Sequence, residues 1–262
     1  MPIQLNPTFR DALRAASRPL AGMWVCTASP LVAEICAGAG LDWLLIDMEH
    51  VPNGLERVLA QLHAVAAHQT TPVVRVPVND TVIIKQVLDL GAQNLLVPMV
   101  SSADEAMAAV EAVRYPPRGR RGVGSALSRS ARWNRVAGYL DDADEHVSLF
   151  VQVETTDAVA AAGEIAAVDG VDGVFVGPSD LAASMGLLGQ QTHPDVVAAV
   201  LRAFEAVREA GKPVGVNAFD PATADAYLAA GAAFILVGAD VTVLARESDA
   251  LAARYVGDAR PL

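Results

Sequence analysis

The sequence contains very little cysteine, and it has no long uncharged apolar run. Two cysteines, Cys26 and Cys36, cannot build the disulfide framework of a small secreted protein, so we expect two free thiols in a reduced compartment. The opening residues, MPIQLNPTFR, lack the apolar core of a signal peptide. No uncharged apolar stretch is long enough to span a bilayer. These absences predict a cytoplasmic protein without a membrane partner.

Positive charge is also in deficit, because the formal net charge is −11 at pH 7. Binding to nucleic acids or to anionic membranes favours clustered Lys and Arg, so we expect neither partner. Hydrophobic residues, in contrast, make up 53% of the chain and charged residues only 19%, which favours a large core over disorder. The length of 262 residues fits one large domain or two small ones.

Eight apolar runs rich in β-branched residues predict eight strands. Most of them are continuous rather than alternating, which is typical of parallel strands covered on both faces. The runs are GMWVC (22–26), DWLLID (42–47), PVVRV (72–76), NLLVPM (94–99), LFVQVE (149–154), GVFVGP (173–178), PVGVN (213–217) and FILVG (234–238).

Helical patterns fill the gaps between these runs, and several end in glycine before the next strand, as at Gly40 and Gly211. The first helix is expected to begin with Asn6 as its N-cap and Pro7 at its first position. Strands alternating with helices over about 250 residues predict a (β/α)8 TIM barrel, with residues 1–262 as a single domain. An open doubly wound sheet is the alternative, although no GxGxxG follows the first strand.

Polar residues stand where five of the predicted strands end. In a barrel of this type the carboxyl ends of the strands form one rim, which carries the catalytic groups. The residues expected at this rim are Asp47, Glu49, His50, Arg75, Gln152, Glu154, Gly177, Pro178, Ser179, Asp180 and Asn217.

Glu154 and Asp180 follow adjacent strands, and two carboxylates with open positions beside them suit Mg²⁺ or Mn²⁺. Arg75 would add a fixed positive charge, and His50 could transfer protons near neutral pH. A metal ion and an arginine together stabilise an enolate. Two purely structural interpretations remain open: Arg75 could form a core ion pair with Asp47, and Glu154 and Asp180 could be helix N-caps.

The scarcity of lysine separates this mechanism from the other common route to an enolate equivalent, a lysine Schiff base. The chain has only two lysines. Lys85 falls in the helix after the third strand, and Lys212 precedes the seventh strand. Neither is expected at the catalytic rim.

An arginine-rich segment, residues 115–148, separates the fourth and fifth strands. One interpretation is a solvated basic loop. The other is an active-site loop that leaves the carboxyl end of strand four and binds a carboxylate or phosphate, with glycines that allow close backbone approach. Its arginines are Arg118, Arg120, Arg121, Arg129, Arg132 and Arg135.

From about residue 8 to 255 the chain resembles the metal-dependent pyruvate aldolases of the 4-hydroxy-2-oxoheptanedioate aldolase group, which are related to 2-dehydro-3-deoxyglucarate aldolase. The matching stretches are AGAGLDWLLIDMEHVPN, QNLLVPM, RYPPRGRRGVGSALSR, VQVET and GVDGVFVGPSDLAASMG. The resemblance implies reversible aldol cleavage of a 4-hydroxy-2-oxo acid to pyruvate and an aldehyde. It also implies a divalent cation, Mg²⁺, Mn²⁺ or Co²⁺, as cofactor.

The resemblance further implies roles for individual residues. Glu154 and Asp180 match the family's metal ligands. Arg75 matches the arginine that holds the carbonyl or enolate oxygen, and His50 the histidine that transfers protons. Asp47 is implied as a supporting catalytic residue.

Other implied roles concern pyruvate and a neighbouring subunit. Gln152 is a candidate for substrate binding, and the turn Gly177, Pro178 and Ser179 matches the one whose backbone receives the pyruvate carboxylate. Asp89 matches an acid that reaches the histidine of a neighbouring subunit. The family members form hexamers in which the last helix packs on a partner.

The sequence departs from the family pattern in three places. Met48 replaces a usual glycine, which we expect to narrow or reshape the rim, and RVPVND and VNAFDP differ where the aldehyde should enter. These differences concern the aldehyde rather than pyruvate. Two other functions stay open: a related carbon–carbon lyase acting on an acyl-CoA or phosphoenolpyruvate, and a non-catalytic barrel.

Overall fold

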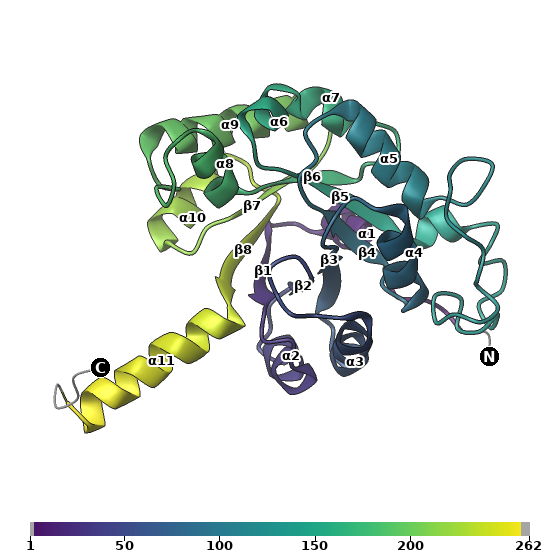
Figure 1. The fold of residues 1–262 in the computed structure, drawn as a ribbon, viewed down its shortest axis with the longest axis horizontal. Helices are drawn as coiled ribbons and strands as arrows, with labels where there is room; N and C mark the ends of the chain where they lie inside the picture. Colours follow the sequence, from purple (N-terminus) through teal and green to yellow (C-terminus); the bar gives the residue numbers. More distant parts are fainter. Residues whose placement is uncertain (1–2, 258–262) are drawn as a thin grey trace.

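Eight parallel strands close into a barrel in the computed structural model, which describes residues 3–257 (Figure 1). Each strand pairs with the next along the chain, and β8 (Phe234–Ala239) pairs with β1 (Leu20–Val25) to close the sheet. The predicted (β/α)8 barrel is therefore confirmed, and the open doubly wound alternative is wrong. The remaining strands are β2 (Trp43–Asp47), β3 (Thr71–Arg75), β4 (Asn94–Val97), β5 (Ser148–Val153), β6 (Gly173–Val176) and β7 (Val214–Asn217).

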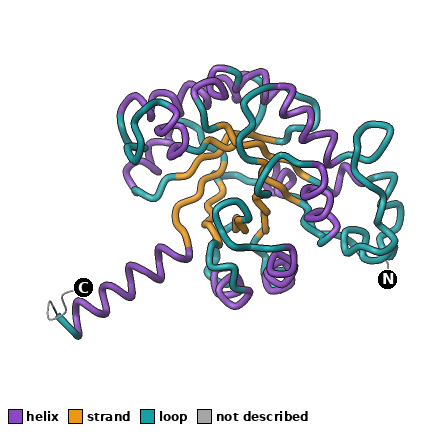
Figure 2. The backbone as a smooth tube through the Cα atoms, viewed as in Figure 1, coloured by secondary structure: helices purple, strands orange, loops and turns teal. Residues whose placement is uncertain are grey.

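Helices surround the strands on the outside of the barrel, as Figure 2 shows. They connect consecutive parallel strands, which cannot be joined by tight turns. The helices are α1 (Phe9–Ala15), α2 (Pro30–Ala37), α3 (Leu55–Val65), α4 (Thr81–Asp89), α5 (Ala103–Val113), α6 (Thr156–Ala160), α7 (Ala162–Ala167), α8 (Pro178–Ser184), α9 (Pro194–Glu209), α10 (Pro221–Ala229) and α11 (Asp240–Tyr255).

The first helix starts later than predicted, because Thr8 rather than Asn6 is its N-cap. The Asp11 N–H donates to Thr8 Oγ1 at 3.2 Å, and the Thr8 N–H donates to the Asp11 carboxylate at 2.9 Å. This reciprocal capping box satisfies two backbone N–H groups at once, which a cap at Asn6 would not do. It places Phe9 in the amino end of the barrel, 5.0 Å from the Trp43 ring and 5.2 Å from Phe150 between ring centroids.

The barrel interior is filled by alternate residues of the strands, since side chains of a strand point to opposite faces in turn. Bulky rings need small neighbours here: a Cβ on Gly22 would lie only 2.6 Å from the Trp43 indole. The same alternation that turns Trp43 and Leu45 inward also turns Asp47 inward, two residues further on. The inward-facing positions of each strand thus carry apolar side chains inside the barrel and polar side chains at its carboxyl rim.

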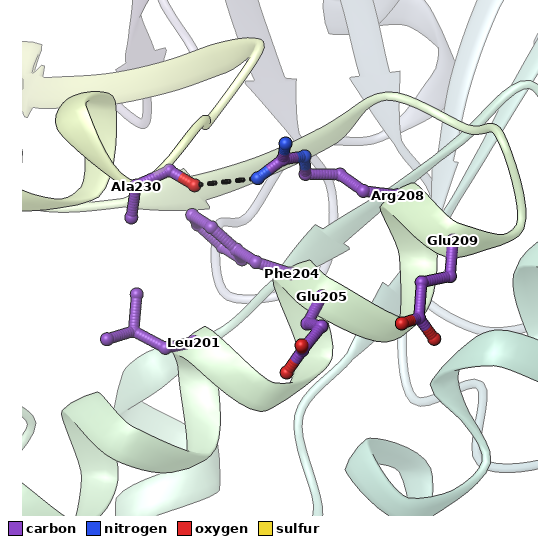
Figure 3. Close-up of a pocket in the computed structure, with 6 residues that line it drawn as sticks. All are labelled: Leu201, Phe204, Glu205, Arg208, Glu209 and Ala230. Atoms are coloured by element: carbon purple, nitrogen blue, oxygen red, sulfur yellow. Dashed lines mark hydrogen bonds between the residues drawn. The ribbon is translucent and has the colours of Figure 1, made fainter.

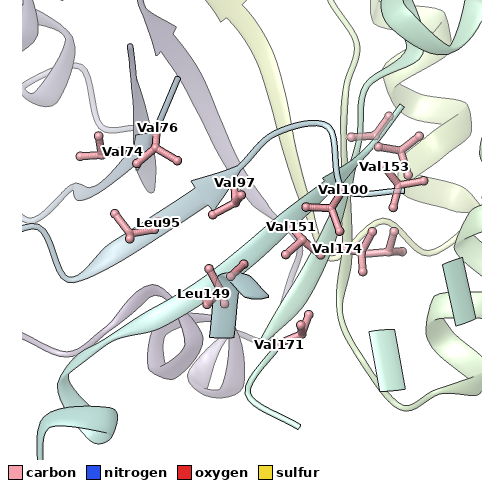
Figure 4. Packing of buried hydrophobic residues seen from close by; sticks show 14 of the residues in the cluster. Val74, Val76, Leu95, Val97, Val100, Leu149, Val151, Val153, Val171 and Val174 are labelled. Carbon is pink, nitrogen blue, oxygen red and sulfur yellow. The ribbon is translucent and has the colours of Figure 1, made fainter. Parts of the chain in front are cut away.

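The opposite faces of the strands pack against the helices and form the larger core. Figure 4 shows part of it, where Val74, Leu95 and Val151 from three neighbouring strands pack together. Each is buried almost completely. Burial of such a side chain contributes roughly 1.5–3 kcal/mol, so this layer holds the rim residues on a rigid scaffold.

The last helix, α11, extends away from the barrel (yellow in Figure 1). Asp240 is its only buried residue within the part of the chain described. The outward-facing Val237 of β8 is consequently 39% exposed, and Leu31 and Ile35 of α2 are each 65% exposed. An apolar strip along β8 and α2 therefore lacks a covering helix from residues 3–257 of its own chain.

The arginine-rich segment does not leave the carboxyl end of β4 and does not lie at the carboxyl rim of this chain, so its predicted position is wrong. Its binding of a carboxylate or phosphate stays a prediction. The segment follows α5, which returns the chain to the amino end of the barrel before β5 begins. Arg121 is buried there, 4.5 Å above the Tyr115 ring, and donates to the Tyr139 hydroxyl at 3.1 Å.

No helix among residues 3–257 is both long and apolar enough to cross a membrane.

Candidate active site

A buried ion pair joins the ends of β2 and β3. Asp47 and Arg75 are register partners, and Arg75 Nε and Nη2 donate to the two Asp47 carboxylate oxygens at 2.8 Å each. Arg75 Nη1 lies 2.8 Å from Glu49 Oε2, without a well-directed hydrogen bond. The core ion pair that the sequence left open therefore exists, and it holds the guanidinium in a fixed orientation at the rim.

An indole ring forms the floor beneath this guanidinium. The Arg75 guanidinium carbon lies 4.4 Å from the centroid of the Trp24 ring, a cation–π contact. Trp24 Nε1 donates to Asn217 Oδ1 at 2.7 Å, which ties β1 to β7 across the barrel. No role for Trp24 was predicted from the sequence. Its spacing of two residues from the inward-facing Gly22 was the available signal that it faces the interior.

His50 lies at the edge of the site, as predicted, and its side chain is 65% exposed. Its backbone N–H faces Asp47 Oδ2 at 3.4 Å, but its imidazole does not contact Asp47. The nearest carboxylate is Glu49, whose Oε1 lies 3.9 Å from His50 Nε2. Glu49, to which the sequence assigned no role, thus stands between the arginine and the histidine. Burial raises the pKa of Glu49, against the opposing effect of Arg75.

Glu154 is buried at the end of β5, and both of its oxygens accept hydrogen bonds. Oε1 accepts from the Met99 N–H at 2.8 Å, and Oε2 accepts from the side-chain amide of Gln152. Burial, reinforced by the negative charges of Asp180 and Glu49, raises the pKa of Glu154 to about 7. The N-cap interpretation of Glu154 is wrong, because Thr155 caps the following helix.

Asp180 occupies the first turn of α8, beside Ser179, and both are exposed at the rim. Gly177 is the N-cap of this helix, so the N-cap interpretation of Asp180 is wrong as well. The Gly177 N–H already donates to the Val153 carbonyl at 3.1 Å, and Pro178 has no N–H. Within the predicted turn, the backbone donors left for an anion are therefore those of Ser179 and Asp180.

Gly177 is required for steric reasons. A Cβ at this position would lie 2.8 Å from Glu154 Oε2 and 3.2 Å from Gln152 Nε2. Any larger residue would displace the Glu154 carboxylate from its present position. The glycine in VFVGPSD is thus explained by the close approach of a neighbouring strand.

The donor set fits a divalent cation. The mutual repulsion of Glu154, Asp180 and Glu49 is not offset at Glu154, and the buried Gln152 Oε1 beside it has no hydrogen-bond partner among residues 3–257. A cation would neutralise this charge. Residues 3–257 contain no group of three His, Cys, Asp or Glu side chains arranged to hold a metal ion, so the protein would supply two carboxylates. Mg²⁺ and Mn²⁺ suit such open sites, because they accept water and substrate oxygens as further ligands.

Asp89 lies far from these residues within one chain. It ends α4, which runs from the carboxyl rim back to the amino end of the barrel. Its Oδ1 lies 3.9 Å from Arg121 Nη2, and burial raises its pKa. Its predicted contact with the histidine of a neighbouring subunit remains a prediction.

Met48 does not narrow the rim, because its side chain is buried in the core between strands and helices. The other expectation, a reshaped rim, stays a prediction. The rim beside β3 and β4 instead carries a hollow of about 490 Å³. Val78, from the divergent RVPVND stretch, and Met99 line it with exposed side chains. Phe219, from the VNAFDP stretch, is 37% exposed after β7. The divergent stretches therefore lie at and beyond the carboxyl ends of β3 and β7.

A second hollow lies on the outside of the barrel, between α9 and α10 (Figure 3). Phe204 and Leu201 line it, and Arg208 crosses it to donate to the Ala230 carbonyl at 3.2 Å. It contains none of the polar strand-end residues. We therefore place the candidate active site at the carboxyl rim.

Known proteins share this fold and much of this sequence. The profile of the family described as HpcH/HpaI aldolase/citrate lyase matches residues 20–246. A 4-hydroxy-2-oxo-heptane-1,7-dioate aldolase of Salmonella dublin is 53% identical over 251 residues, which cover 96% of this chain and 95% of that protein. The crystal structure of an aldolase/citrate lyase family protein from Burkholderia cenocepacia J2315 is 42% identical, with a TM-score of 0.90, and the match covers 94% of this chain and 98% of that one. A citrate synthase structure, SbnG, is 27% identical with a TM-score of 0.84 over 94% of this chain and 96% of its own.

Proposed function

Because the chain belongs to the HpcH/HpaI aldolase/citrate lyase family, we propose that it is a divalent-metal-dependent aldolase, a carbon–carbon lyase. Its reaction is the reversible cleavage of a 4-hydroxy-2-oxo acid to pyruvate and an aldehyde. One observation carries the proposal: Glu49 lies 2.8 Å from the buried Arg75, and the negative charges of Glu49 and Asp180 act on the buried Glu154 at the same rim. This pairing of negative metal ligands with a fixed cation suits an enolate.

A divalent cation held by Glu154 and Asp180 would polarise the substrate carbonyl and offset the charge of the enolate. Arg75 stabilises the same carbonyl oxygen as it becomes the enolate oxygen. Asp47 accepts hydrogen bonds from Nε and Nη2 of Arg75, so other N–H hydrogens of the guanidinium are left for the substrate. Gln152 adjoins the substrate carbonyl, and the N–H groups of Ser179 and Asp180 receive the carboxylate.

His50 moves the protons in this scheme. As the C3–C4 bond of the substrate breaks, His50 takes the proton of the 4-hydroxyl group and the aldehyde carbonyl forms. The electron pair of the broken bond becomes the enolate of pyruvate, and a proton delivered to C3 completes the methyl group. Glu49 Oε1 lies 3.9 Å from His50 Nε2, so a carboxylate stands beside the group that transfers the proton.

The uncovered apolar strip along β8 and α2 supports an assembly of several subunits. We propose a homo-oligomer, a hexamer, in which α11 of one subunit covers β8 and α2 of another. Exposed apolar side chains on both surfaces support this: Leu31, Ile35 and Val237 on the barrel, and Val241, Val243, Leu244, Leu251 and Tyr255 on α11. Asp89 would then act on a neighbouring subunit. We further propose that residues 1–262 form a single domain and that the protein is cytoplasmic.

The direct test is cleavage of 4-hydroxy-2-oxoheptanedioate, measured as pyruvate released with Mg²⁺, Mn²⁺ or Co²⁺ and after treatment with EDTA. We expect release that needs metal and returns when metal is restored. Release that is unchanged in EDTA would contradict the mechanism. Absence of release with all three metals, together with release of free CoA from acetyl-CoA and a 2-oxo acid, would favour the acyl-CoA lyase alternative.

A further inference from the structure

Three arginines of the segment between α5 and β5 have no carboxylate partner within 4.0 Å among residues 3–257: Arg129, Arg132 and Arg135. Arg135 is exposed, whereas Arg129 and Arg132 are half-buried. Other arginines of the same segment are ion-paired: Arg118 with Asp144, Arg120 with Glu111 and Arg121 with Asp89. In a chain whose net charge is −11, two neighbouring unpaired cations that lose hydration need another source of compensation.

The two guanidinium groups converge on one point. Arg129 Nη1 lies 2.7 Å, and Arg132 Nη1 lies 3.0 Å, from the position that a Cβ on Gly91 would occupy. Their polar contacts are backbone carbonyls: Arg129 Nη1 donates to Leu90 at 3.0 Å, and Arg132 Nη1 donates to Arg129 at 2.6 Å. Most of their N–H hydrogens therefore remain free, and two like charges repel each other at short range.

The arginines line a cavity of about 530 Å³ at the amino end of the barrel. Its walls come from α1, from the end of α3 and from the start of β3, and they include the polar side chains of His68 and Gln69. One acidic residue, Asp11, lines it, and the Asp11 carboxylate is occupied by the backbone and hydroxyl groups of Thr8. The cavity is large enough for a small molecule that bears a phosphate or two carboxylates.

Two further observations indicate concentrated positive charge that the fold holds in place. Burial, reinforced by Arg132, lowers the pKa of Arg129 to about 10, and His63 on the adjoining α3 has its pKa lowered by burial and by both arginines. Arg132, Trp133 and Asn134 are consecutive non-glycine residues with φ of 49°, 56° and 64°. Such left-handed backbone is unfavourable for Arg132 and Trp133, although asparagine tolerates it, and strained backbone of this kind clusters at ligand sites.

We propose that Arg129 and Arg132 bind a doubly charged oxyanion, a phosphate or a dicarboxylate, in this cavity. Two guanidinium groups at one point match the oxygens of such a group, because each can donate two parallel N–H bonds. The site lies at the opposite end of the barrel from the carboxyl rim and does not depend on the aldolase proposal. Since the Arg129 N–H donates to the Asp89 carbonyl at 3.0 Å, the bound anion would also fix the backbone of Asp89.

The test is calorimetric titration of the full-length protein with inorganic phosphate and, separately, with succinate, at constant ionic strength set with chloride. We expect one anion per chain, with a dissociation constant of about 1 mM or below for the preferred class. Arg129→Met and Arg132→Met should each weaken binding by about tenfold or more, because each removes one bidentate donor. Phosphate and succinate titrations distinguish the two sources of the oxyanion.

Arg135→Met is the matched control, because Arg135 is exposed in the same segment and stacks on Trp133 at 5.8 Å. It should bind the anion as the unaltered protein does. Arg129→Lys keeps the positive charge but loses the two parallel N–H donors of the guanidinium. This variant should bind the anion with intermediate affinity, provided that circular dichroism shows an intact fold. Absence of binding at roughly 10 mM of either anion would overturn the proposal. Binding by Arg129→Met that equals binding by the unaltered protein would also overturn it. Loss of binding in Arg129→Met together with dissociation of the oligomer would overturn it too, because the arginines would then belong to a subunit contact.

Discussion

Asp47 and Arg75 form a buried ion pair with two parallel hydrogen bonds of 2.8 Å, across register partners of β2 and β3. Pairing fixes the plane of the guanidinium above Trp24 and satisfies one edge of it. Breaking a buried pair by removing one partner typically costs 3–5 kcal/mol, since the other charge stays buried. The relationship therefore bears on stability and on catalysis at once.

Asp47→Asn should lower the free energy of unfolding by about 3 kcal/mol and reduce turnover by about a hundredfold or more, because Arg75 loses its orientation. Urea unfolding and pyruvate release measure the two effects. The double variant Asp47→Leu with Arg75→Met removes both charges, and it should recover most of the stability without any recovery of activity. Recovery of activity in the double variant would show that Arg75 does not contact the substrate.

Glu154→Gln and Asp180→Asn should each weaken Mn²⁺ binding by about a hundredfold or more, because each loses one charged ligand, while the fold is retained. Glu154→Gln should also make the metal-free protein more stable to heat, since it removes a buried charge next to Asp180 and Glu49. Calorimetric Mn²⁺ titration and thermal unfolding provide the two readouts. Unchanged Mn²⁺ affinity in both variants would place the metal elsewhere.

Metal affinity should depend on pH through Glu154, whose pKa is raised from 4.5 to about 7. Below pH 7 the cation must displace a proton, so the apparent affinity should rise about tenfold per pH unit and become constant above pH 7. The stability of the metal-free protein should change in the opposite direction and fall as pH rises. The raised pKa contributes stability that is fully present below pH 4.5 and is lost as pH rises through about 7. Titrations between pH 5 and pH 8, with Glu154→Gln as a flat control, check both slopes.

Met99 holds Glu154 through its backbone, with φ of 55° and an N–H that donates at 2.8 Å. Glycine adopts this conformation freely, so Met99→Gly should keep Mn²⁺ affinity within about twofold. Met99→Val should weaken it by about tenfold, because a β-branched residue is strained at positive φ by 1–2 kcal/mol. Equal Mn²⁺ affinity in the two variants would mean that the Met99 N–H does not position Glu154.

His50→Ala should slow proton transfer to and from the methyl carbon of pyruvate by about a hundredfold, the usual contribution of a general acid or base. Pyruvate binding should survive, because the exposed imidazole contacts neither Glu154 nor the turn at Ser179 in this structure. The two readouts are the rate of deuterium exchange and the pyruvate dissociation constant. A collapse of pyruvate affinity with an unchanged exchange rate constant would assign His50 to binding instead.

The strands and the polar rim could be predicted from the sequence because both depend on local patterns. Apolar runs mark the strands, and the period of two along β2 and β5 places Asp47, Gln152 and Glu154 on the inner face. The position of the arginine-rich segment could not be predicted in this way. It depends on α5, whose length returns the chain to the opposite end of the barrel.

Contacts between distant residues were also beyond the sequence. Nothing local in VPM indicates that the Met99 N–H meets Glu154, because that contact depends on the register of β4 and β5. The floor at Trp24 likewise depends on the closure of the barrel, which brings β1 beside β2 and β8. The cap at Thr8 is a local feature that was wrongly predicted, because Asn6 and Pro7 show a stronger start signal than the reciprocal pair with Asp11.

The central claim is that this rim forms the enolate of pyruvate with the help of a divalent cation. Proton NMR of pyruvate in D₂O tests it most directly, with Mg²⁺ or Mn²⁺ present and then with excess EDTA. The account predicts that the methyl signal disappears with metal, persists in EDTA, and persists with metal in Glu154→Gln. A methyl signal that persists with every divalent cation tested, or exchange that continues in EDTA, would contradict it.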